Sequence, residues 1–175
     1  AGGALTAWDP ETFDGNALPD FLGEIRAIAP FGGTIYIGGR FTQAGGLATP
    51  EPRDHIAAVD PVSGAVTAWD PIASNGGGET IVRTIVPTAS VVYLGGQFSA
   101  LNNPAYTRVG LGAVSTATGA VTAWNPGSTP PNGGGNVRTL VLDGTTIYAG
   151  GEFTGIGSAA RNYAAGIDTT TFAIT

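Results

Sequence analysis

The sequence predicts an all-β protein, a β-propeller of four-stranded antiparallel blades, with three blades in this chain. One motif recurs three times at nearly constant spacing, and the segments around it are rich in β-branched residues without an apolar stripe of helical period. These segments are apolar on both faces, so both faces of each sheet must be covered. A small sheet covered on both sides by copies of itself is a propeller blade.

The repeat is clearest in a seven-residue motif. Residues 36–42 read Tyr-Ile-Gly-Gly-Arg-Phe-Thr, and the motif returns at 93–99 and 148–154, in steps of 57 and 55 residues. A tryptophan followed by Asp-Pro or Asn-Pro and an arginine ahead of the motif recur in the same order. We therefore expect one repeat domain over residues 1–175, with blades at about 9–69, 70–124 and 125–175.

Four extended segments are expected in each blade, bounded by glycine, proline or Asx turn signals. In the first blade they are Ile25 to Ala29, Thr34 to Phe41, His55 to Asp60 and Ala65 to Trp69. Residues 4–8 resemble a fourth strand without its own blade, and we expect them to complete the last blade or that of a neighbouring chain.

Three blades are fewer than the roughly four to eight that close a propeller ring. Either two chains form a six-bladed ring, or the chain is a fragment of a longer array, or the blades stack openly. The chain begins with Ala1 instead of methionine, which favours the fragment.

Long connections that differ between the copies should gather at one end of the blades, because the short turns all belong to the other end. Binding residues concentrate on such loops, so any binding surface is expected there. Candidates at its rim are Arg40, Gln97 and Glu152, which share one strand position, and His55.

Six of the seven arginines recur at fixed blade positions, which is typical of a role in the blade itself. Each is expected to pair with a carboxylate or a backbone carbonyl. An alternative for the first group is a ring of arginines that lines a central channel for an anionic ligand. The two groups are Arg26, Arg83 and Arg138, and Arg53, Arg108 and Arg161.

The tryptophans at the ends of the fourth segments, Trp8, Trp69 and Trp124, are expected to pack and to lead into a turn. They could stack on sugars only if their indole faces are exposed. The glycine doublets lie inside a strand with no helix after them, so we interpret them as bulges or points of close backbone approach, not as phosphate loops.

Composition limits the classes of function. The net charge is -6 and all seven cations are arginine, which argues against nucleic acid or an anionic membrane as a partner. The chain has no cysteine, hence no disulfide, thiolate nucleophile or thiolate metal ligand. His55, the only histidine, follows Asp54 directly, and adjacent strand residues point to opposite faces. We expect no enzyme activity, cofactor, metal or membrane insertion.

The Tyr-x-Gly-Gly-x-Phe-Thr core, the Ala-Ala-Val-Asp-Pro segment and the closing Val-Thr-Ala-Trp-Asp-Pro resemble the bacterial delta-60 repeat, a β-propeller family of unknown function. The glycine doublet also resembles kelch repeats. These resemblances imply a secreted or surface-attached bacterial protein that binds proteins or glycans. Copper radical oxidases on kelch-like blades need a cysteine cross-link, which this chain cannot form.

These observations predict a non-catalytic extracellular module that mediates structure or interaction. Its expected partner is itself, through strand exchange, or the rest of a longer parent chain. Two alternatives remain open, a carbohydrate-binding propeller and a fragment of a propeller enzyme.

Overall fold

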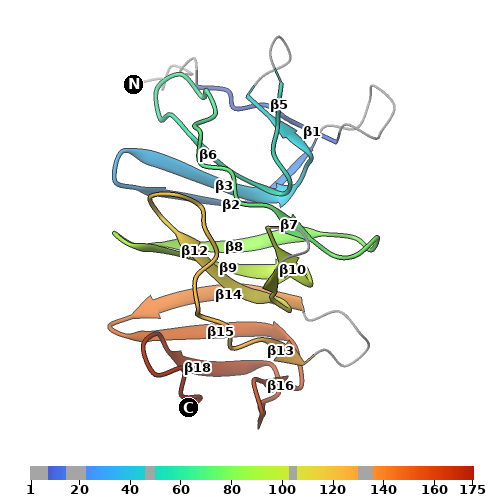
Figure 1. Cartoon of the computed structure of the whole chain (residues 1–175), viewed down its shortest axis with the longest axis vertical. Coiled ribbons are helices and arrows are strands. Elements are labelled where there is room, and N and C mark those ends of the chain that lie inside the picture. Colours follow the sequence, from blue (N-terminus) through green and yellow to red (C-terminus); the bar gives the residue numbers. More distant parts are fainter. Residues whose placement is uncertain (1–7, 15–22, 46–49, 103–105, 130–135) are drawn as a thin grey trace, which may run out of the picture.

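A computed structural model of the chain describes residues 8–14, 23–45, 50–102, 106–129 and 136–175. These residues form β-strands and no helix, and the strand pairs are antiparallel, so the all-β prediction is confirmed. Figure 1 shows the main sheets one after another along the long axis of the molecule, one for each copy of the sequence repeat.

Each main sheet has three strands, and the strand with the glycine doublet lies in the middle. The second and third sheets also touch through one backbone pairing, Asn136 with Gln97. The strands of the three sheets are, in order, β2 (Glu24–Phe31), β3 (Thr34–Arg40) and β6 (Ile56–Val59); β8 (Ile81–Pro87), β9 (Val91–Gln97) and β12 (Leu111–Ser115); and β14 (Asn136–Asp143), β15 (Thr146–Glu152) and β18 (Ala164–Asp168).

The expected fourth strand is reduced to one bridge in each repeat, which corrects the four-stranded prediction for the described residues. Val66 bridges to Val59, and Val121 and Ile174 make the same bridge in the other repeats. Beyond this bridge a side chain holds the segment, because Arg53 Nη2 donates to the carbonyl of Thr67 at 2.7 Å. The expected strand at residues 4–8 lies outside the described residues except for Trp8.

The long connections contain short strands that the sequence did not predict. In each repeat they form a small three-stranded sheet. In Figure 1 these small sheets lie at one end of the main strands, opposite the tight β2–β3 and β14–β15 turns. The strands are β1 (Thr12–Phe13), β4 (Gln43–Ala44) and β5 (Glu51–Pro52); β7 (Ala73–Ser74), β10 (Ala100–Leu101) and β11 (Tyr106–Thr107); and β13 (Ser128–Thr129), β16 (Gly155–Ile156) and β17 (Ala159–Ala160).

Neighbouring sheets meet along their first two strands. Strand β8 contacts β2 and β3, and β14 contacts β8 and β9. The first glycine of each of the first two doublets permits this approach. A Cβ atom on Gly38 would lie 2.7 Å from Val82 Cγ1, and one on Gly95 would lie 2.9 Å from Val137 Cγ1.

The second glycine of each doublet has a different role. Opposite it the first strand of the sheet carries a β-bulge, and a Cβ on Gly39 would collide with the backbone carbonyl of Glu24. Gly96 and Gly151 face the same obstacle. The two glycines thus serve the two purposes that their position inside a strand indicated, close approach between sheets and a bulge within one.

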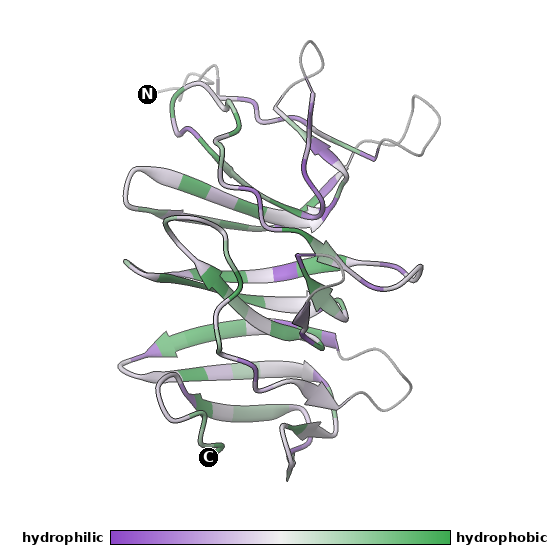
Figure 2. Ribbon diagram, in the orientation of Figure 1, coloured by the Kyte–Doolittle hydropathy of each residue, from purple (hydrophilic) through white to green (hydrophobic). Residues whose placement is uncertain are grey.

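The hydrophobic core of the described residues consists of three buried clusters. One joins residues of the first and second repeats, another joins residues of the second and third, and the third lies within the first repeat around Ile37 and Phe41. The phenylalanine of the motif is buried in every repeat, as Phe41, Phe98 and Phe153. Figure 2 shows hydrophobic residues along the main strands and a hydrophilic break within β8.

We predict that Gly38→Ala lowers the free energy of unfolding by about 1–3 kcal/mol, as is usual when a methyl group is forced into a packed interior. Gly150 is the matched control, because its Cβ would meet Thr139 at 3.0 Å and Tyr163 O at 3.8 Å, both in its own repeat, and no residue of another sheet. Urea unfolding followed by far-UV circular dichroism measures both variants. Equal losses would contradict the assignment of Gly38 to the contact between sheets.

Candidate functional site

A bulge on the first strand of each main sheet presents an arginine. Ile25 pairs with Gly39 and Ala27 with Gly38, which leaves Arg26 without a partner in the ladder. Arg83 and Arg138 occupy the same place on β8 and β14. A bulge redirects the side chain of its extra residue. The three arginines, one from each repeat, line a common hollow of about 200 Å³.

The outer two arginines of this hollow have acidic partners. Arg26 Nη2 lies 2.6 Å from Glu24 Oε1, and Arg138 Nη2 lies 2.6 Å from Glu152 Oε1. The central Arg83 forms no ion pair with any described residue, and its buried Nε has no hydrogen-bond partner there. Burial lowers the pKa of Arg83, and the positive charges of Arg138 and Arg26 lower it further, against the smaller opposing effect of the Glu79 and Glu152 charges.

The sequence explains why Arg83 lacks a carboxylate. The residue two places before the arginine is Glu24 in the first repeat but Ile81 in the second. The residue that ends the middle strand is Glu152 in the third repeat but Gln97 in the second. Only the second repeat has no glutamate at either of these two positions. A comparison of the repeats at these positions could have identified Arg83 from the sequence.

The expected rim residues at the ends of β3, β9 and β15 all lie beside this hollow or in the joints between repeats. Arg40 Nη1 lies 3.2 Å from Glu79 Oε1, a residue that leads into the second sheet. Gln97 pairs with Asn136 at the start of β14. Hydrogen bonds from Arg138 and Asn136 lower the pKa of Glu152, which keeps it charged at neutral pH.

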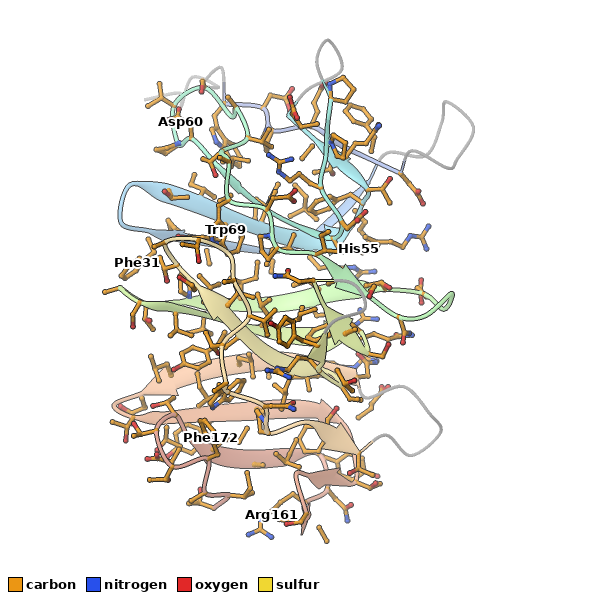
Figure 3. All side chains as sticks on the ribbon, viewed as in Figure 1. Phe31, His55, Asp60, Trp69, Arg161 and Phe172 are labelled. Carbon is orange, nitrogen blue, oxygen red and sulfur yellow. The ribbon has the colours of Figure 1, made fainter. Side chains whose placement is uncertain are left out.

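His55, the fourth rim candidate, occupies a turn with a left-handed backbone. Its φ is 68°, and the matching residues Gly110 and Tyr163 have φ values of 68° and 70°. The His55 carbonyl accepts a hydrogen bond from Gly39 N at 3.0 Å. Burial lowers the pKa of the imidazole despite the opposing charges of Asp54 and Asp14, so the ring is neutral at pH 7. Figure 3 shows His55 toward the end with the small sheets.

The second arginine group binds the backbone of its own repeat. Arg108 Nη1 donates to Thr107 O at 2.9 Å, and its Nη2 donates to Thr122 O at 2.6 Å. Arg53 makes the equivalent pair of bonds. Arg161 donates to Ala160 O at 3.0 Å and is half-buried, at the lower edge of Figure 3. These contacts describe arginines that hold strand ends in place.

The tryptophans connect successive repeats. Trp69 meets Tyr36 of its own repeat edge to face, with ring centroids 5.0 Å apart, and donates to Ser115 O of the next repeat at 2.9 Å. Trp124 meets Tyr93 in the same way. Trp69 and Trp124 are buried, so the exposed indole faces that sugar stacking requires are not present at these two positions.

The third repeat departs from this pattern. The Nε1 atom of Trp124 is buried without a hydrogen-bond partner. The turn after β18 has Phe172, with φ 62°, where the other repeats have Gly64 and Gly119. In the second repeat this turn lies against the segment that follows Trp69. A Cβ on Gly119 would lie 3.3 Å from Pro71 N. The third repeat thus has both the bulky Phe172 in this turn and a Trp124 whose Nε1 makes no hydrogen bond to a described residue.

No cluster of three or more histidine, cysteine or acidic residues suited to a metal ion occurs in the described parts of the chain. Nor do those parts contain a helix with the length and apolar character needed to cross a membrane. Comparison with protein-family models and with curated proteins found no match. The candidate site in the described residues is therefore the hollow lined by Arg26, Arg83 and Arg138.

We predict that Trp69→Phe lowers the free energy of unfolding by about 1 kcal/mol more than Trp124→Phe does. This difference is the typical net contribution of one hydrogen bond. Both variants lose similar packing, but only Trp69 gives up a bond to a backbone carbonyl. Far-UV circular dichroism during urea unfolding reports on both without relying on indole fluorescence. If Trp124→Phe cost as much as Trp69→Phe, the bond to Ser115 would contribute nothing.

We also predict opposite effects for two arginines. Arg108→Gln should cost about 2–4 kcal/mol, because it removes two hydrogen bonds from a charged donor to backbone carbonyls. Arg83→Gln should stay within about 0.5 kcal/mol of the wild type or exceed its stability, since Arg83 has no partner to lose. Chemical unfolding at low salt measures both. A large loss for Arg83→Gln would place it among the structural arginines.

Proposed function

We propose that the chain is a non-catalytic interaction module that assembles end to end with a second copy of itself into a β-propeller. The observation that carries this proposal is internal to the chain. Side chains that are buried where two repeats meet are exposed at the two ends of the stack. Because the repeats are copies, the inner contacts indicate what the end faces bind.

The first end face is on the first repeat. Ile28 is 57% exposed, whereas the matching Ile85 and Leu140 are 7% and 6% exposed. A cleft of about 450 Å³ opens beside Ile28 and is also lined by Trp8 and Ile25. In the interior of the stack this position is covered by the glycine of the preceding repeat, as Gly38 covers Ile85.

The second end face is on the third repeat. Tyr148 is 51% exposed, whereas the matching Tyr36 and Tyr93 are 4% and 7% exposed. Val141, which pairs with Tyr148 across the sheet, is 57% exposed. Beside them Gly150 would place a Cβ near no residue of a further sheet. This face therefore presents Gly150 and Tyr148, whose counterparts in the first two repeats pack where two repeats meet, but no further sheet of this chain covers it.

The two end faces are complementary. Trp8 Nε1 donates to Asp60 O at 3.1 Å, just as Trp69 donates to Ser115 O, so Trp8 already sits on the first sheet as Trp69 sits on the second. Among the described residues, tyrosine pairs with Trp69 and with Trp124 but not with Trp8. A second copy would supply Tyr148 to Trp8 and repeat the contact between Tyr36 and Trp69.

Such a contact is heterologous, and it forms a closed assembly only if successive sheets turn around an axis. The sheets approach each other along their first two strands and glycines, as blades do around a propeller axis. Two chains would give six blades, within the roughly four to eight that close a ring. The resemblance to delta-60 repeats supports the same architecture. The absence of free thiols is compatible with the extracellular location that we propose.

Light scattering tests the assembly. We predict a concentration-dependent rise toward twice the chain mass of 17.5 kDa for the wild type. Ile28→Glu and Tyr148→Glu should each keep the chain monomeric, because each buries a charge in the joint. Val62→Glu is the control, because Val62 is 78% exposed and does not line the cleft beside Ile28. Its mass should follow the wild type.

Mixing the two monomeric variants tests the head-to-tail geometry. Ile28→Glu retains an intact Tyr148 face, and Tyr148→Glu retains an intact Ile28 face, so together they should form a dimer through one joint. An interface between like faces would gain nothing from mixing. A wild type that stays monomeric at millimolar concentration, or a dimer that survives both substitutions, would overturn the proposal.

A further inference from the structure

We infer that the hollow formed by Arg26, Arg83 and Arg138 binds a small multivalent oxyanion, one that carries several carboxylate or phosphate groups. The inference concerns the first strands of the sheets, not the end faces, and it does not depend on assembly.

The distribution of charge supports this inference. Three guanidinium groups from three different repeats meet in one hollow, and only Glu24 and Glu152 pair with them. The cluster therefore keeps one unpaired positive charge in a chain whose net charge is -6. Like charges gathered in a partly buried place oppose folding unless an anion compensates them, so such a cluster is a candidate anion-binding site.

The other recurrent arginines show what a structural solution looks like in this fold. Arg53 and Arg108 each donate two hydrogen bonds from their Nη atoms to backbone carbonyls, although their buried Nε atoms, like that of Arg83, have no hydrogen-bond partner among the described residues. Arg83 lines the hollow and forms no such bond from its Nη atoms to a described residue. These Nη donors are the ones that a ligand in the hollow would engage.

The chemistry of the donors selects the ligand class. Guanidinium is a planar fork that matches carboxylate and phosphate oxygens with two parallel hydrogen bonds, and it stays charged at any physiological pH. The hollow of about 200 Å³ accommodates a small molecule with several anionic groups. Because each arginine is fixed on a bulge of a paired strand, the three donors are positioned before the ligand arrives.

Isothermal titration calorimetry with citrate and with pyrophosphate tests the inference, with acetate at equal ionic strength as the monovalent control. The Ile28→Glu background keeps assembly from contributing to the heat. We expect saturable binding of at least one of the two multivalent anions at a stoichiometry of one per chain. Citrate and pyrophosphate separate carboxylate from phosphate chemistry.

Three variants locate the site. Arg83→Gln should weaken binding at least tenfold, and Arg83→Lys should weaken it less, since lysine keeps the charge but not the fork. Arg161→Gln is the matched control, because it removes the same charge from another half-buried arginine that does not line the hollow, and it should bind like its parent. Circular dichroism verifies that each variant is folded.

Several results would overturn the inference. One is the absence of saturable binding of either multivalent anion at millimolar concentration. Another is an equal loss of affinity in Arg161→Gln and Arg83→Gln, which would mean that the anion responds to net charge alone. Binding that Arg83→Gln leaves unchanged would also exclude the hollow.

Discussion

The close approach of neighbouring sheets at the first glycines of the first two doublets holds the three repeats together. Gly38 and Gly95 let the following sheet come within van der Waals contact, and buried side chains such as Ile85 and Leu140 fill the space that this creates. Two of the three buried clusters therefore join neighbouring repeats, and the third lies in the first repeat, where Trp8 packs against it. Contacts between neighbouring repeats are a main source of stability in repeat proteins.

The same constraint determines where function can arise. Because the first strands of successive sheets meet, a residue at the bulge of each strand is brought together with its copies, as the hollow of Arg83 and its neighbours shows. Because every sheet contributes one half of each joint, the ends of the stack expose the unused halves, Ile28 and Tyr148. A site built from equivalent residues and a pair of complementary end faces both result from repetition.

The sequence predicted the all-β class, the positions of the strands around each glycine doublet and the gathering of long connections. It failed for the fourth segment, whose ladder pairing is a single bridge, with Arg53 bonded to Thr67 O beyond that bridge. The small sheets were missed because strands of two residues, such as β4, leave no periodic pattern. Arg83 lacks an ion pair because Ile81 and Gln97 stand where the other repeats have Glu24 or Glu152. The importance of these two positions becomes clear only when the structure shows which residues lie beside the arginine.

A cysteine pair tests the central account, that the joint between repeats is repeated between copies. Ile85 Cδ1 would lie 2.9 Å from a Cβ on Gly38, so Ile28 of one copy should meet Gly150 of the other. The chain has no cysteine of its own, which makes the double variant Ile28→Cys with Gly150→Cys free of competing thiols. Mild oxidation should link it into a covalent dimer on a non-reducing gel, while Val62→Cys with Gly150→Cys stays unlinked. Equal linking of both variants, or linking of neither, would contradict the account.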